Sequence, residues 1–195
     1  MKKEEDRMIY VIGHVGNEGI KAIIDNKKKD LQDYFSKSFI DKIYKKILDE
    51  DKILSKFDVQ YEKSFDTVHI LPIKKGGVFS ALWDMSKKEF VGMDFSQRDI
   101  PIHQEVIEIC NFYDILPYRL LTDHSYIVFE KQEWVEKMTL KYEDVSIRCI
   151  GKLYNKKECA RIDGDTKAYL TKDYKDEIDK VIPNYIKNMY KKNAI

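Results

Sequence analysis

Two adjacent glycines, Gly76 and Gly77, stand between a predicted strand and a predicted helix, and they are the clearest ligand-binding pattern in the sequence. Glycines at a helix N-terminus let the backbone approach a phosphate closely, while N–H groups and the helix dipole attract its charge. Lys74 and Lys75 add positive charge just before them. We therefore predict an anion site formed by Lys74, Lys75, Gly76, Gly77 and Val78. Alternatively, the glycines only permit tight strand-to-helix packing and the lysines lie in a solvated turn.

A second glycine cluster, Gly13, Gly16 and Gly19, follows the apolar run MIYVIGHV. Consecutive backbone N–H groups in such a turn can form a second ligand-binding cradle. The spacing is not the GxGxxG dinucleotide fingerprint, because the first two glycines are three residues apart. A purely structural turn is the favoured alternative.

The histidines do not form a recognisable metal motif. His14, His69, His103 and His124 have neither the HxxxH nor the HxH spacing that presents two imidazoles to one metal. The sequence does not decide whether His14, His103 and His124 converge in space. No GxSxG motif or P-loop occurs, and we predict no catalytic residue and no metal ligand.

The composition argues against several classes of function. The 195 residues fit one domain, and 35 basic against 34 acidic side chains leave a formal charge of +1, which argues against nucleic acid or a membrane as partner. No run approaches the ~20 apolar residues of a membrane span, and the N-terminus has no signal-peptide pattern. Cys110, Cys149 and Cys159 lack paired spacing, so we expect buried thiols in a reducing, cytoplasmic compartment.

The periodicity predicts alternating strands and helices. Strands are expected at 8–15, 67–73, 91–95, 125–131, 145–154, 158–162 and 167–170, with hairpin turns at 155–157 and 163–165. Helices are expected at 18–28, from Ser36 or Lys37 to Ile47, at 53–57, 78–88, 103–113 and 132–142, and over a tail at 173–192 that breaks near Pro183. The expected fold class is α/β with α+β character, a mixed sheet with helices packed on it.

Four stretches in order resemble the C-terminal domain of the aminoimidazole ribonucleotide (AIR) synthetase superfamily, which includes hydrogenase maturation factors and selenophosphate synthetases. They are VIGHVGNEGIKAI, KKGGVFSALWDM, VGMDFSQRDIPIHQEVIEIC and DILPYRLL. The resemblance implies a three-layer α/β/α domain with a partly ferredoxin-like sheet, over residues 8–182, between a polar tail at 1–7 and a charged helical tail at 183–195. In the family this domain follows an ATP- and magnesium-binding domain and is usually dimeric; here we expect it to be free-standing.

The sequence also departs from the family pattern. Leu71-Pro72 stands where the family has His-Asp, and Lys74-Lys75 where it has Thr-Glu or a similar pair. The segment Thr122 to His124 replaces Ser-Ser-Gly, and His103 replaces an arginine. These changes argue against inherited catalysis.

Three functions remain open. The preferred one is a non-catalytic accessory module that binds an anionic, phosphate- or nucleotide-like ligand or a protein partner. The first alternative is a subunit of an ATP-dependent enzyme, completed by a separately encoded ATP-binding domain; only then would ATP and magnesium be cofactors. The second is a homodimeric regulatory protein.

Overall fold

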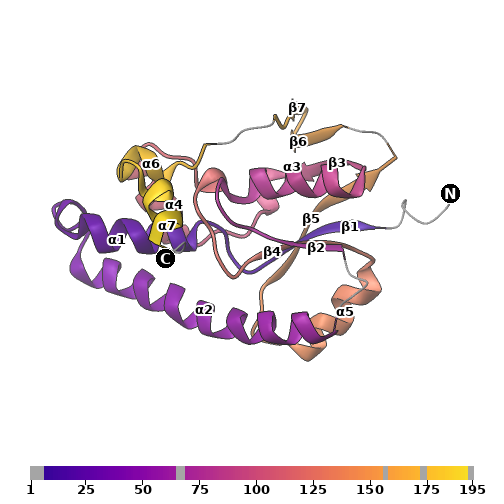
Figure 1. Ribbon diagram of the computed structural model, residues 1–195, viewed down its shortest axis with the longest axis horizontal. Coiled ribbons are helices and arrows are strands. Elements are labelled where there is room, and N and C mark those ends of the chain that lie inside the picture. The colour runs from indigo at the N-terminus through magenta and orange to yellow at the C-terminus, as the bar shows by residue number, and fades with distance from the viewer. Residues whose placement is uncertain (1–6, 65–68, 156–157, 172–174, 193–195) are drawn as a thin grey trace.

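The computed structural model describes residues 7–64, 69–155, 158–171 and 175–192, and it shows a mixed α/β arrangement (Figure 1). The strands are β1 (Met8–Ile12), β2 (His69–Pro72), β3 (Gly92–Ser96), β4 (Tyr126–Glu130), β5 (Ile147–Tyr154), β6 (Cys159–Asp163) and β7 (Thr166–Tyr169). The helices are α1 (Asn17–Gln32), α2 (Lys37–Ser64), α3 (Gly77–Glu89), α4 (Gln104–Phe112), α5 (Gln132–Lys141), α6 (Ile178–Val181) and α7 (Tyr185–Lys192), with short 3-10 turns at Gln97–Asp99 and Pro117–Arg119.

The alternation of side chains along β1 explains the layers. Ile9 and Val11 belong to one apolar cluster, which they share with α3. Tyr10 and Ile12 point to the opposite face and join a second cluster with α2 and α5. Because both faces of the strand are buried, helices cover the sheet on both sides (Figure 1), which confirms the α/β class with a mixed sheet.

The seven strands are ordered β2-β4-β1-β5-β3-β6-β7, and only the β3–β6 pair is parallel among the described pairings. The hairpin predicted at 163–165 is confirmed, since β6 and β7 pair with Asp163 opposite Thr166. The hairpin predicted at 155–157 is wrong, because β3 lies between β5 and β6. Residues 156 and 157 themselves lie outside the described part.

Two helices are longer than the sequence suggested. The charged stretch after Asp25 continues α1 to Gln32, with a kink at Lys27. The separate helices expected up to Ile47 and over 53–57 are one helix, α2, because their apolar positions lie on a single stripe that packs against the core. The Ser36 hydroxyl accepts the N–H of Phe39, so Ser36 caps the N-terminus of α2.

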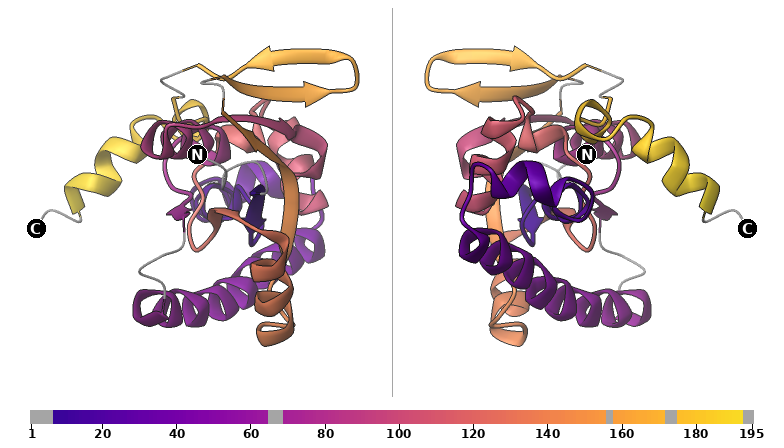
Figure 2. Two further views of the ribbon diagram at one scale, coloured as in Figure 1. Left: turned by 90° about the vertical axis from the view of Figure 1, so that its right-hand side faces the viewer. Right: turned by 90° about the vertical axis from the view of Figure 1, so that its left-hand side faces the viewer.

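The third apolar cluster joins α1, α2 and α4 to the C-terminal segment. The tail is broken around Pro183 into α6 and α7, as predicted, and Ile186 of α7 is buried in this cluster. Figure 2 shows α7 extending from the body of the molecule. Among the described residues no helix combines the length and apolar character needed to cross a bilayer.

The thiols follow the prediction only in part. Cys110 and Cys159 are buried, and burial raises the pKa of each to about 12. Cys149 is exposed on β5, so the expectation of three buried thiols is wrong for it. The strand does not alternate strictly at this point, because its pairing with β1 shifts register between Ile9 and Tyr10, and Arg148 and Cys149 are both exposed.

Candidate functional site

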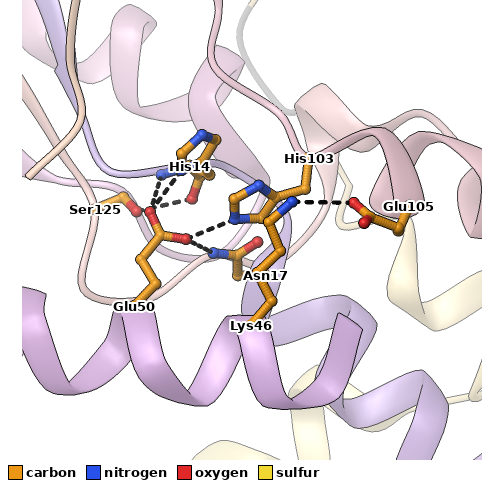
Figure 3. Close-up of polar contacts among 7 residues, drawn as sticks. All are labelled: His14, Asn17, Lys46, Glu50, His103, Glu105 and Ser125. Carbon is orange, nitrogen blue, oxygen red and sulfur yellow. Dashed lines mark hydrogen bonds and ion pairs between the residues drawn. The ribbon is translucent and has the colours of Figure 1, made fainter. Parts of the chain in front are cut away.

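The carboxylate of Glu50 is the point where side chains from three distant segments meet (Figure 3). Its Oε1 lies 2.6 Å from Nδ1 of His14, and its Oε2 lies 2.8 Å from Nε2 of His103. Asn17 donates its Nδ2–H to the same Oε2 at 2.8 Å. A single carboxylate therefore holds two imidazoles and an amide.

The two imidazoles are stacked on each other. Their ring centroids are 3.8 Å apart with an interplanar angle of 21°. The exposed fraction of the side chain is 25% for His14, 15% for Glu50 and 8% for His103. The centre is thus largely shielded, but it is reached by solvent from the side of His14.

Electrostatics favour an ionised Glu50. Burial alone would raise its pKa, but the hydrogen bonds with His103 and His14, together with charge on the imidazoles, hold the pKa far below its ordinary value. Glu50 therefore carries a negative charge in a largely shielded environment.

Local structure positions each member. His14 lies in the turn after β1, where its own N–H donates to Glu50 at 3.0 Å and its carbonyl accepts the Ser125 hydroxyl at 2.9 Å. His103 is the N-cap residue of α4: its backbone is extended, and its side chain makes no capping hydrogen bond. Glu50 lies on the buried stripe of α2, between Ile47 and Leu54. The centre therefore joins three elements, and His14 contributes to it through both its backbone and its side chain.

The structure thus brings together two of the three histidines that the sequence singled out. His14 and His103 converge on Glu50, whereas His124 lies beside Asp123 at 3.9 Å instead. His69 pairs with Glu89 elsewhere on the sheet.

The double-glycine turn has a carboxylate of its own. Asp176, which is 4% exposed, accepts the N–H of Gly76 at 2.7 Å and the N–H groups of Leu121 and Ile178 at 3.1 Å each. An internal anion therefore takes the Gly76 N–H that the sequence offered to a ligand, and anion binding by this backbone group stays a prediction that would require Asp176 to move.

Gly77 is required by packing. Its φ is 64°, and a Cβ there would come within 2.9 Å of the Arg119 backbone and closer still to the carbonyl oxygen of Tyr118. The turn is therefore tightly packed, but against the 3-10 turn Pro117–Arg119 and not against a strand as the alternative proposed. This packing does not by itself decide whether a ligand also binds.

The lysines of the predicted site face two different ways. Lys74 forms an ion pair with Asp123, on the loop that leads to β4. Lys75 lines a hollow of about 740 Å³ together with residues of the segment around α6, among them Lys175 and Lys180. Val78 is fully buried in the cluster under α3, so its side chain cannot reach a ligand.

The N–H groups of the other three glycines also have partners within the chain. Gly13 donates to the carbonyl of Ser146 at 2.8 Å, Gly16 to the hydroxyl of Thr122 at 2.8 Å, and Gly19 to the carbonyl of Leu121 at 2.8 Å. These contacts are those of a structural turn, and a ligand cradle at Gly13, Gly16 and Gly19 stays untested.

Sequence reasoning missed Glu50 and Asp176. Glu50 lies in the acidic run Asp49 to Asp51, which looks like a solvated helix face, yet its spacing from Ile43 and Ile47 continues the buried stripe. A carboxylate on that stripe was the available signal. Asp176 had no comparable signal, because it lies inside the charged tail that the sequence predicts to be helical over 173–192.

Comparisons with known proteins add a fold relationship. No protein-family model matches the sequence. The chain is 23% identical over 136 residues to a putative hydrogenase expression/formation protein of Methanocaldococcus jannaschii, a match that covers 69% of this chain and 37% of that protein.

Two crystal structures give the same relationship in three dimensions. The hydrogenase maturation protein HypE in complex with ATP matches with a TM-score of 0.65 at 10% identity, over 91% of this chain and 53% of that chain. A HypE–HypF complex matches with a TM-score of 0.60 at 15% identity, over 87% and 54%. The chain therefore spans about half the length of the solved structures that it matches.

Proposed function

We propose that this chain, which has the fold of the AIR synthetase-like superfamily that includes hydrogenase maturation proteins, is an accessory module that binds an anionic, phosphate- or nucleotide-like ligand and does not catalyse ATP-dependent chemistry alone. The observation that carries the proposal is the hollow beside the double-glycine turn, which is lined by Lys75, Lys175 and Lys180. Its position at the predicted ligand turn and its lysines both suit a phosphate group.

Three lysines and three acidic side chains line the hollow, so the case for an anion depends on which of them are already bound. Asp176 is already bound to three backbone N–H groups, Glu177 pairs with Lys180 at 2.5 Å, and Asp179 accepts the N–H of Ile186 at 3.1 Å. Lys75 and Lys175 have no ion-pair partner within the described residues. Two ammonium groups are thus available at the hollow, while each acidic side chain already has a partner.

The residues at the end of β2 argue against catalysis by this chain alone. Leu71 and Pro72, which stand where the family has His-Asp, form the end of the edge strand β2. Neither side chain can transfer a proton or bind magnesium. A phosphate near this turn would be held by lysine ammonium groups, because the Gly76 N–H is bound to Asp176.

Calorimetric titration of the purified chain with ADP, ATP and inorganic phosphate tests the proposal. We expect at least one of these anions to bind, and the Lys75→Ala/Lys175→Ala double variant to weaken binding about tenfold or more, since one hydrogen bond to a charged group contributes about 1.5 kcal/mol. Lys141→Ala, at a hollow elsewhere on the surface, is the matched control and should leave binding unchanged.

Two results would overturn the proposal. One is the absence of binding for all three anions. The other is ATP hydrolysis by the purified chain that disappears when Gly77 is replaced by a bulky residue, because this would make the chain an enzyme in its own right.

A second candidate is a subunit of an ATP-dependent enzyme. It is favoured by the match to about half of a HypE chain that was solved with ATP. Such a subunit should gain ATPase activity when mixed with a separately produced ATP-binding domain of the superfamily, and should gain none from an unrelated ATP-binding protein. A homodimer also stays a prediction, which sedimentation of the purified chain would decide.

A further inference from the structure

The Glu50 centre has a ligand set that the proposed function does not use. Its three groups come from the turn after β1, from α2 and from the residue before α4, and they are 36 and 53 residues apart in sequence. Their ligating atoms, on His14, Glu50 and His103, all lie within 4.8 Å of one another. Two imidazoles with one carboxylate are a donor set that suits zinc and related transition metals.

The distances are compatible with an ion after a small adjustment. Tetrahedral zinc with bonds of about 2.0–2.1 Å places neighbouring ligand atoms roughly 3.3 Å apart. The present contacts of Glu50 to His14 and His103 are 2.6 and 2.8 Å, which is the range of direct hydrogen bonds. An ion would therefore replace these two hydrogen bonds and require the carboxylate to withdraw by roughly half an ångström. It would also require at least one of the two stacked imidazoles to turn, so that both ring nitrogens aim at the ion.

Asn17 supplies an independent observation that points to a ligand. It is 2% exposed, and while its Nδ2 donates to Glu50, its Oδ1 is buried without any hydrogen-bond partner among the described residues. A buried amide oxygen without a donor costs stability. A network made only of His14, Glu50 and His103 leaves this oxygen unsatisfied, whereas a cation carrying a bound water would provide the missing donor.

Hydrogen bonds from neighbouring groups hold the candidate metal ligands in place. Glu50 is further oriented by the N–H of His14, and the carbonyl of His14 is held by the Ser125 hydroxyl. Contacts of this kind fix ligand orientation around metal ions. The accessible edge at His14 gives an ion a route from solvent.

We propose that His14, Glu50 and His103 bind one divalent transition-metal ion, with zinc as the first candidate, and that Asn17 supports it from the outer shell. Three protein ligands leave a fourth position for water, the pattern of open rather than closed structural zinc sites. The proposal is independent of anion binding, because none of these residues lines the hollow beside α6.

Zinc titration of the chelator-treated full chain tests this inference, with Co²⁺ used as a spectroscopic substitute. We expect one zinc per chain, a visible Co²⁺ absorption typical of a nitrogen- and oxygen-ligated tetrahedral ion, and a rise in unfolding temperature with zinc concentration. Asn17→Ala should weaken zinc binding about tenfold, as loss of an outer partner does.

Ligand variants give the decisive comparison. Glu50→Gln and His103→Gln should each weaken zinc binding by more than about 100-fold, beyond the range for an outer partner. His69→Gln removes a histidine that is likewise paired with a glutamate, but on the other side of the sheet, and should leave binding unchanged. Circular dichroism of each metal-free variant verifies that it is folded, and His14→Gln replaces any variant that is not.

Three results would overturn the inference. The wild-type chain could take up no zinc, the folded ligand variants could bind it as tightly as the wild type, or His69→Gln could abolish binding. In each case the Glu50 centre would be a hydrogen-bonded network of purely structural value.

Discussion

Glu50 and Asp176 are both shielded carboxylates, but they are held by opposite kinds of partner. Glu50 is held mainly by side chains, two imidazoles and an amide, whereas Asp176 is held by three backbone N–H groups. Imidazoles can exchange a hydrogen bond for a metal ion, while a backbone N–H can only donate to an acceptor and cannot ligate a metal. A carboxylate held by backbone N–H groups therefore occupies the donors that a ligand would need. A carboxylate held by histidines leaves those histidines able to bind a metal ion instead.

The strongest test of this contrast is to remove Asp176. Asp176→Ala leaves three buried N–H groups without an acceptor, and we expect the free energy of unfolding to fall by about 4 kcal/mol. Asp179→Ala is the matched control, because Asp179 accepts one N–H at the same segment and should cost about 1 kcal/mol. Urea denaturation of both variants measures the difference, and equal losses would show that the three-donor cap has no special value.

A second test addresses the turn that Asp176 caps. Gly77→Ala should lower the free energy of unfolding by about 2–3 kcal/mol, because the new Cβ would collide with the backbone of Tyr118 and Arg119 at a positive φ. Gly164→Ala shares the positive φ but meets nothing within 4 Å, so it should cost only about 1 kcal/mol. If both alanine variants have the same stability, the close approach at Gly77 is not what the turn requires.

The smallest expected effect concerns the exposed ion pair at the edge of this turn. Burial would raise the pKa of Asp123, but the hydrogen bonds from Lys74 and from the His124 backbone, together with the charge of those two residues, outweigh burial and lower it. A lowered folded-state pKa stabilises the protein above the ordinary Asp pKa of about 3.9, and that contribution is lost as pH falls through the folded-state value.

Asp123→Asn should therefore cost about 0.5 kcal/mol at neutral pH, the range for a solvent-screened pair. The difference from wild type should shrink below about pH 4. Chemical denaturation at neutral and acidic pH checks this, and a difference that grows toward acid would contradict the assigned sign.

The sequence predicted the sheet and most helices because their signals are local. Alternation along β1 and the run from Phe79 to Met85 reflect burial that neighbouring residues already encode. The length of α2 was missed because its charged centre, Asp49 to Lys52, looks like a loop until the buried stripe is followed through it. The false hairpin at 155–157 arose because β3, from much earlier in the chain, inserts between its two strands.

The sites depended on contacts that the sequence does not encode locally. His14 and His103 were noted as candidates, yet their meeting point is a residue of a third element, and only the packing of α2 under the sheet brings Glu50 there. Similarly, the sequence predicts a ligand turn at Gly76, but the carboxylate of Asp176, one hundred residues later, accepts its N–H. Pairing over such separations is set by topology and not by spacing.

Anomalous diffraction at the zinc edge, from crystals grown with zinc and phosphate, tests the contrast between the two carboxylates most directly. We predict an anomalous peak between His14, Glu50 and His103, with Asp176 still bound to the N–H of Gly76 and any phosphate at Lys75 and Lys175. The contrary result would be no peak at Glu50 together with a phosphate on the Gly76 N–H and Asp176 displaced, which would reverse the roles assigned to the two centres.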